Sequence, residues 1–177
     1  MRLRGDPSPH ARTARMIRVD HAGEYGAVRI YQGQRAVLGH GPAGPVLAYM
    51  QAQEDAHLAR FAALIAERRV RPTALLPLWH LAGFALGAAT AALGERAAMA
   101  CTVAVEEAIC DHYATQEAAL PATEADLRAT IAGFRAEEAE HRDIGLDHGA
   151  REMPGYRLLT AAIKTGCRAA IALSERI

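Results

Sequence analysis

Two parts of the chain carry the same arrangement of residues that bind transition metals. Glu24 precedes a Glu-x-x-His unit at residues 54–57 by 30 positions, and Glu106 precedes a second unit at residues 138–141 by 32 positions. On a helix, positions i and i+3 project from one face, so each unit presents a carboxylate and an imidazole side by side. Carboxylate and imidazole ligands without thiolate suit iron or manganese. The pattern predicts a site for two such ions.

The repeated spacing is stronger support than the short motif, which also occurs by chance. In an antiparallel helix pair, two residues reach one height when they lie equally far from the turn. A separation of about 30 residues leaves some 13 residues on each arm and a short loop, so each arm rises by about 20 Å. We therefore expect two helix pairs that bring the metal-binding side chains to one level.

The predicted ligands divide into terminal and bridging members. Glu54 and Glu138 project from the helices that also carry the histidines, so these two glutamates are the better placed to bridge two ions. The other two glutamates would each bind one ion, as would each histidine. The predicted metal ligands are Glu24, Glu54, His57, Glu106, Glu138 and His141. The alternative is a metal-free cluster of Glu–His hydrogen bonds, but six such groups would be very costly to bury together.

Four more residues are candidates for the surroundings of the ions. A ligating imidazole usually donates its other N–H to an acceptor, and Asp20 could be that acceptor or an ordinary surface acid. Tyr113 could deliver protons or electrons, or simply fill the core. His112 and His148 could lie at the mouth of the site, or be plain polar residues.

The composition favours the helices that this site requires. Only 5% of the 177 residues are aromatic, and long alanine-rich segments lack Gly and Pro, which suits one all-α domain. Thr123, three residues before Asp126, is a candidate N-cap for the fourth helix. Residues 1–10 are expected to be disordered and residues 11–177 to form the single domain. The expected helices cover residues 11–38, 46–69, 94–120, 123–149 and 154–177.

Residues 73–94 contain no Asp, Glu, Lys or Arg. If the two helix pairs are related by a two-fold axis, a crossover of bundle length must join the second helix to the third. The segment is long enough to span a bilayer, but its proline, glycines and histidine argue against spanning. We expect a crossover with an apolar, membrane-facing surface, with burial against the bundle and a true span as alternatives. The residues expected at the membrane and the substrate entrance are Leu78, Trp79 and Phe84.

Basic residues accompany this segment and the last helix. Anionic lipid headgroups would attract these side chains. The pair Gly83 and Gly87 would permit close helix contact, and the oligomeric state stays open. The basic residues are Arg68, Arg69, Arg71, Arg157, Lys164 and Arg168.

The net charge and the cysteine content bear on the partners and the cellular compartment of the protein. Twenty basic and twenty acidic residues balance, so no nucleic-acid partner is expected. The odd number of cysteines, Cys101, Cys110 and Cys167, and the lack of Cys-x-x-Cys argue for a reducing compartment without disulfides. No secretory signal or organelle transit helix is visible at the N-terminus.

Longer strings around these residues match a known family. The strings are Asp20-His-Ala-Gly-Glu-Tyr-Gly26, Gln53-Glu-Asp-Ala-His57, Arg71-Pro-Thr, Pro77-Leu-Trp, Gly83-Phe-Ala-Leu-Gly87, Met99-Ala-Cys-Thr-Val-Ala-Val-Glu-Glu107, His112-Tyr113, Glu138-Ala-Glu-His141, Asp143-Ile-Gly-Leu-Asp-His148 and Leu173-Ser-Glu-Arg. From residue 15 to 177, the chain resembles the demethoxyubiquinone hydroxylases (3-demethoxyubiquinol 3-hydroxylase) of ubiquinone biosynthesis. Only the linker at 117–130 looks shorter than in eukaryotic members, away from the ligands.

The resemblance implies a ferritin-like di-iron fold with all six family ligands present. It implies a monooxygenase that hydroxylates the ring of demethoxyubiquinol (2-methoxy-5-methyl-6-polyprenyl-1,4-benzoquinol) with two Fe²⁺ ions, O2 and electrons ultimately from NADH. Because no Gly-x-Gly-x-x-Gly unit is present, electrons would arrive through the bound quinone or from a separate reductase.

The lipid-resident substrate implies a peripheral location on the cytoplasmic face of the bacterial inner membrane, or the matrix side of the mitochondrial inner membrane. A ubiquinone-biosynthesis complex or a lipid-carrier protein would be a further partner. Two alternatives are a ferritin-like iron-oxidising protein, which predicts a polar surface, and a non-catalytic quinone-binding scaffold, which would not need six ligands.

Overall fold

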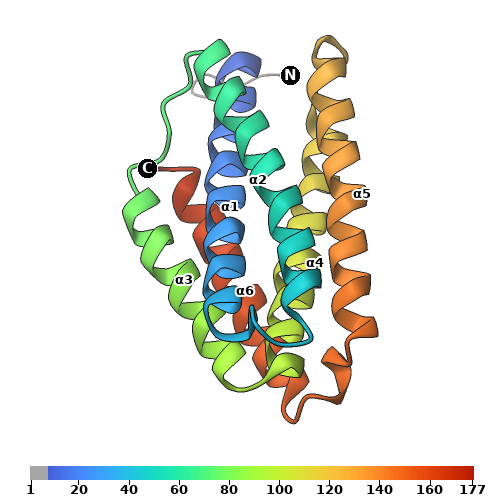
Figure 1. Ribbon diagram of the computed structural model, residues 1–177. Helices are drawn as coiled ribbons and strands as arrows, with labels where there is room; N and C mark the ends of the chain where they lie inside the picture. The colour runs from blue at the N-terminus through green and yellow to red at the C-terminus, as the bar shows by residue number, and fades with distance from the viewer. Residues whose placement is uncertain (1–7) are drawn as a thin grey trace.

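The computed structural model describes residues 8–177, and this range folds into six α-helices and two short 3-10 turns (Figure 1). Helices α1, α2, α4 and α5 form a four-helix bundle, in which α2 and α4 run in the same direction because α3 returns between them. The helices are α1 Pro9–Leu38, α2 Gly44–Glu67, α3 Leu76–Ala92, α4 Glu95–Ala119, α5 Ala125–Asp147 and α6 Tyr156–Ser174, and the turns are Ala122–Glu124 and Ala150–Glu152. The predicted all-α, ferritin-like bundle with a crossover and a C-terminal helix is confirmed.

Most helix ends differ from the prediction by one to three residues, and two of these differences concern how the helix is capped. Thr123 lies inside a 3-10 turn and does not cap α5, whose N-cap is Glu124 without a side-chain hydrogen bond. Ser8 caps α1 by accepting the backbone N–H of Ala11 at 3.0 Å, so the helix begins two residues earlier than expected. The rest of the segment predicted to be disordered, residues 1–7, lies outside the described range.

Helix α3 packs lengthwise against α1 because glycines let the two backbones approach. A Cβ atom on Gly83 would lie 2.8 Å from the carbonyl oxygen of Gly26, and one on Gly87 would overlap the carbonyl oxygen of Ile30. Gly33 of α1 meets the backbone of α3 in the same way. The pair predicted to permit close helix contact is therefore used within the chain.

The fold is a repeat of one three-helix unit. Helix α3 lies against α1, and α6 lies against α4 in the same way. The second helices of the two units, α2 and α5, complete the bundle. Apolar clusters fill the bundle towards both of its ends. One contains Ile17, Phe61, Leu64, Leu127 and Ile131, and the other contains Leu47, Met50, Met99, Ala100 and Val103. The three cysteines are free, with Cys101 buried and the other two half-buried.

Only one side of α3 is covered by the bundle. Leu78, Leu81 and Phe84 have 50%, 70% and 41% of their surface exposed. Trp79 is half-buried, and its indole N–H donates to the hydroxyl of Ser174 at 3.1 Å. Within residues 8–177, no helix has both the length and the apolar character needed to cross a bilayer.

Two of the basic side chains expected to meet lipid headgroups have acidic partners in the chain. Arg68 pairs with Glu124 at 2.6 Å, and Lys164 pairs with Glu107. On α6, Arg157 and Arg168 are exposed.

Candidate metal centre

The four bundle helices bring the six predicted ligands together in the interior. Each of the six side chains has at most 1% of its surface exposed. Nδ1 of His57 lies 3.1 Å from Oε1 of Glu138 and 3.6 Å from Oε2 of Glu24. Nδ1 of His141 lies 3.0 Å from Oε1 of Glu54 and 3.3 Å from Oε2 of Glu138. Both imidazoles thus direct Nδ1 at the carboxylates.

Within the described residues, potential ligand atoms form two overlapping groups, each within 4.8 Å. Glu54 and Glu138 belong to both groups, whereas each remaining ligand belongs to one. The first group is Glu24, Glu54, His57 and Glu138, and the second is Glu54, Glu106, Glu138 and His141. Two neighbouring cation positions with two shared carboxylates would account for this arrangement.

The cluster leaves many buried polar atoms without a hydrogen-bond partner. Glu54 has both carboxylate oxygens unpartnered, and Oε2 of Glu24, Glu106 and Glu138 is unpartnered as well. Buried polar groups are normally satisfied, because an unsatisfied one costs about 1–3 kcal/mol and a charged one more. Cations would satisfy these oxygens, so the residues present are suited to the metal pair that the sequence predicts.

Burial and mutual repulsion strongly perturb the carboxylates. Burial, followed by the negative charge of Glu138, raises the pKa of Glu54 and Glu106 well above the usual value. Burial acts in the same direction on Glu138, but hydrogen bonds and charge from His141 and His57 lower its pKa to about 2. Burial would lower the pKa of His57, but hydrogen bonds and charge from Glu138 and Glu24 raise it to about 11. Metal-free, the cluster therefore retains protons at neutral pH that cations would displace.

Two tyrosines donate hydrogen bonds across the bundle to Glu24 and Glu106, the glutamates predicted to bind one ion each. Tyr31 donates its hydroxyl to Oε1 of Glu106 at 2.7 Å, and Tyr113 donates to Oε1 of Glu24. Each tyrosine comes two turns after the glutamate on its own helix and contacts the glutamate of the other unit. Tyr113 is a predicted candidate, whereas Tyr31 is not. The repeat offset of 82 residues between Glu24 and Glu106 also relates these tyrosines and could have identified Tyr31.

The outer nitrogens of both imidazoles have partners that differ from the prediction. Nε2 of His57 lies 2.5 Å from Oε2 of Glu137, and Nε2 of His141 lies 2.6 Å from Oε1 of Gln53. Glu137 and Gln53 each stand directly before a Glu-x-x-His unit, and this position in both repeats is the sequence signal that identifies them.

Asp20 is not the acceptor that was predicted for a ligating imidazole. Its carboxylate accepts from Nε2 of Gln116 at 2.6 Å and lies 3.3 Å from Nε2 of His112. Burial raises the pKa of Asp20. His112 has 17% of its side chain exposed, so it links this buried pair to the surface.

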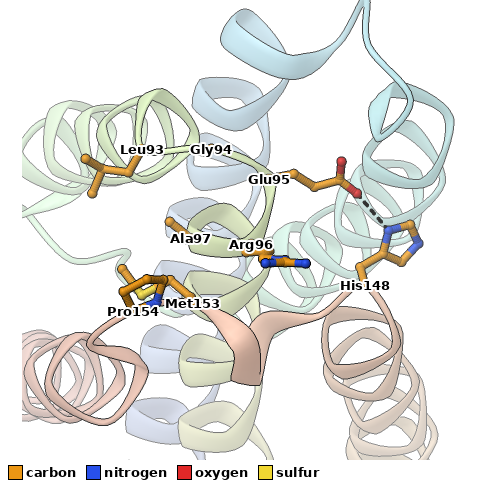
Figure 2. A pocket seen from close by; sticks show the side chains of 8 residues that line it. All are labelled: Leu93, Gly94, Glu95, Arg96, Ala97, His148, Met153 and Pro154. Atoms are coloured by element: carbon orange, nitrogen blue, oxygen red, sulfur yellow. Dashed lines mark hydrogen bonds and ion pairs between the residues drawn. The ribbon is translucent and has the colours of Figure 1, made fainter.

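His148 lies away from the mouth of the site. Figure 2 shows its ring directed at the carboxylate of Glu95, with Nδ1 and Oε1 3.0 Å apart, at a pocket of about 590 Å³ where α3 joins α4. Glu95 precedes Glu106 on α4 by eleven residues, or roughly 16 Å. None of the six predicted ligands lines this pocket.

A second cavity is lined by sequence neighbours of Glu24 and Glu106, although none of the six ligands themselves lines it. It has a volume of about 560 Å³ and is lined by residues of α1, α3, α4 and α6. Gly23 and Ala27 line it on either side of Glu24, and Val105 and Ile109 line it beside Glu106. The α6 side is lined by Leu159, Ala162, Ile163, Gly166, Cys167, Ala170, Ile171 and Ser174. We call this cavity the apolar groove.

Three glycines in the groove wall face open space. Gly23, Gly26 and Gly166 line the groove, and a Cβ atom on any of them would meet no other atom within 4 Å. Gly23 and Gly26 stand on α1 and Gly166 on α6, inside helices, where glycine costs about 1 kcal/mol relative to alanine. Unlike Gly87, they are not required for packing.

Comparison with known proteins bears on this arrangement. The sequence profile described as "Ubiquinone biosynthesis protein COQ7" matches residues 11–174. The chain belongs to the COQ7 family. The family predicted from the motif strings is therefore confirmed, and it covers all six helices apart from the first two residues of α1.

Relatives in bacteria and eukaryotes are similar along nearly the whole chain. A Rhodospirillum rubrum protein named "3-demethoxyubiquinol 3-hydroxylase" is 60% identical over 177 residues, which cover 99% of this chain and 84% of the relative. The human protein named "NADPH-dependent 3-demethoxyubiquinone 3-hydroxylase, mitochondrial" is 54% identical over 176 residues, covering 97% and 81%. A Saccharomyces cerevisiae protein named "5-demethoxyubiquinone hydroxylase, mitochondrial" is 43% identical over 180 residues, covering 92% and 77%.

Proposed function

We propose that this COQ7 family member is a di-iron 3-demethoxyubiquinol 3-hydroxylase. The observation that carries the proposal is the buried cluster of four carboxylates and two imidazoles, with unpartnered oxygens, beside an apolar groove. The names of its relatives give the same activity. Glu24 and His57 would bind one iron ion, and Glu106 and His141 the other. Glu54 and Glu138 would bridge the two, because they belong to both ligand groups.

Bound iron would allow O2 to be reduced. One oxygen atom would enter the ring and the other would leave as water, and the reaction would use two electrons and two protons. The protein supplies the surroundings. Tyr31 and Tyr113 hold one oxygen of each terminal carboxylate and thereby leave the other oxygen free for a cation. Complete burial keeps bulk water from the cluster, and charge interactions are stronger in such a site.

The apolar groove is the proposed binding site of the polyprenyl quinol. Its lining on α6 runs from Leu159 to Ser174, which is roughly 22 Å of helix. The same turns of α1 and α4 that carry Glu24 and Glu106 form its floor, so a ring at that level would lie beside the terminal ligands. The tail would extend between α3 and α6. A ferritin-like iron store or a metal-free scaffold needs no such combination of groove and ligand cluster.

We infer that the exposed apolar side of α3 faces the membrane from which the substrate comes. Leu78 and Phe84 are exposed there, and Trp79 lines the groove next to them. The protein would bind peripherally, at the cytoplasmic face of a bacterial inner membrane. A lipid-carrier protein or a ubiquinone-biosynthesis complex would be its partner at the same surface. Replacing Leu78 and Phe84 with Asp should reduce flotation with liposomes, and unchanged flotation would contradict this orientation.

A nicotinamide cofactor is the proposed source of electrons. The family resemblance implies NADH, whereas the mammalian relatives are named for NADPH. Turnover with each cofactor in turn decides between them, and the electrons would pass through the bound quinone or a separate reductase.

The activity is tested with iron-loaded protein, a short-tailed demethoxyubiquinone, NADH or NADPH, and ¹⁸O2. We expect a product with one additional hydroxyl group that carries one ¹⁸O atom, measured by mass spectrometry. Glu138→Ala should abolish the product because it removes a proposed bridging ligand. In cells that lack the gene, the demethoxy intermediate should accumulate and disappear on expression of the wild-type protein. Unlabelled product, or unchanged quinones in the deletion strain, would contradict the proposal.

A further inference from the structure

The inner surroundings of the two proposed metal positions are matched. Residues 82 positions apart on α1 and α4, and 84 positions apart on α2 and α5, occupy equivalent places around the cluster. Each position would have one terminal glutamate, one histidine and a tyrosine that holds the glutamate. The equivalent pairs are Glu24 with Glu106, Tyr31 with Tyr113, Glu54 with Glu138, and His57 with His141.

The outer partners of the two histidines break this symmetry. Gln53 and Glu137 are equivalent, since they too are 84 positions apart, and each contacts the histidine of the opposite helix. Glu137 places a carboxylate oxygen 2.5 Å from Nε2 of His57. Gln53 places an amide oxygen 2.6 Å from Nε2 of His141. The two imidazoles therefore have the same geometry, but one has an anionic acceptor and the other a neutral one.

This difference has a direct consequence for metal affinity. A hydrogen bond from an imidazole N–H to a carboxylate is charge-assisted and roughly twice as strong as one to a neutral amide. Such an outer partner fixes the ring and increases its basicity as a ligand, and its loss typically weakens metal binding by 10- to 100-fold. Within the described residues, the ion-pair contact of Glu137 is the one with Nε2 of His57.

We propose that Glu137 and Gln53 are positioning residues that make the two metal positions unequal, with the ion at Glu24 and His57 bound first and more tightly. The inference rests on the proposed di-iron site. It adds an order of loading, set by an acid and an amide that contact histidines and do not contact the ions.

The test is an anaerobic titration of metal-free protein with Fe²⁺, in which isothermal calorimetry measures the binding of each ion. The wild type should show two phases of one ion each. Glu137→Gln should weaken the tight phase by about 10- to 100-fold and bring the two phases together. Gln53→Glu should strengthen the weak phase. Asp143→Asn is the matched control, because Asp143 lies on the same helix, is 59% exposed and accepts from Arg142 at 2.8 Å. Its isotherm should equal that of the wild type.

A double exchange, Glu137→Gln with Gln53→Glu, separates this role from a general effect on folding. It keeps both outer hydrogen bonds and the net charge, and it should reverse the order of loading. Adding one equivalent of ⁵⁷Fe and then one of ⁵⁶Fe reports the first-loaded position by Mössbauer spectroscopy. We expect the wild type and the exchanged variant to give the doublets of opposite positions.

The outcomes also separate this inference from the proposed function. Two ions of equal affinity in an active wild-type enzyme would overturn the unequal positions alone, as would identical isotherms for Glu137→Gln and Asp143→Asn. An exchanged variant that loads in the wild-type order would overturn them too. A wild-type protein that binds no Fe²⁺ would overturn both proposals.

Discussion

Gly166 offers a test in which stability and function should change in opposite directions. A Cβ atom at this position would meet nothing within 4 Å, and Gly166 lines the apolar groove. Gly166→Ala should stabilise α6 by about 1 kcal/mol, because alanine is the better helix residue. For a chain of this length, that corresponds to a rise in Tm of about 2–4 °C.

Gly166→Leu should gain similar helix stability while its side chain occupies groove volume that we assign to the polyprenyl tail. Each tail CH2 displaced from an apolar surface costs about 0.8 kcal/mol of binding. Displacing two or three of these groups would raise KM by roughly 15- to 60-fold. A tail-free quinol analogue does not use that volume, so its turnover should change little.

The assay combines thermal unfolding with steady-state turnover of a polyprenylated and a tail-free substrate. The expected result is an increased Tm for both variants and a selective loss with the polyprenylated substrate for Gly166→Leu. A lower Tm for Gly166→Ala would show that the glycine is needed for packing. An equal loss with both substrates would show that the tail does not lie in this groove.

Three further outcomes follow from the same contacts. Gly87→Ala should lower Tm despite the better helix propensity, because the added methyl group overlaps a backbone carbonyl of α1 and overpacking costs about 1–3 kcal/mol; an unchanged Tm would contradict the close α1–α3 contact. Tyr31→Phe should destabilise the metal-free protein by about 1–3 kcal/mol, measured by urea unfolding, because Oε1 of Glu106 loses its donor; equal stability would remove this role. Metal binding at pH 7 should release protons, because the pKa of His57 is raised to about 11 and those of the buried glutamates Glu54 and Glu106 are also raised. Affinity should therefore increase with pH, and calorimetry in two buffers of different ionisation enthalpy should give different apparent heats; identical heats would contradict proton release.

The repeated spacing was sufficient to predict the bundle and the gathering of its six buried polar groups. Helix phase decides which side chains point inward, and two arms of equal length decide their height. Glu24 and Glu54 illustrate this, because they meet only if the turn between α1 and α2 lies midway. The same argument predicted a return crossover of bundle length between two parallel helices, and α3 occupies this crossover.

The outer contacts could not be predicted in the same way. Asp20 is one turn from a ligand, but an i to i+4 neighbour does not determine which side chain of another helix lies opposite. Gln116 and His112 meet Asp20 from α4, and Glu137 reaches His57 from α5. His148 follows His141 by two turns, yet it lies at the helix end and faces Glu95. These contacts depend on the offset between helices, which the sequence reveals only when both repeats are aligned.

Anomalous diffraction at the iron edge, from crystals of protein loaded with Fe²⁺ without oxygen, tests the metal pair most directly. We predict two peaks inside the bundle, one near Nδ1 of His57 and one near Nδ1 of His141, with Glu54 and Glu138 in contact with both. A single peak, peaks at the protein surface, or no peak between these helices would contradict the account.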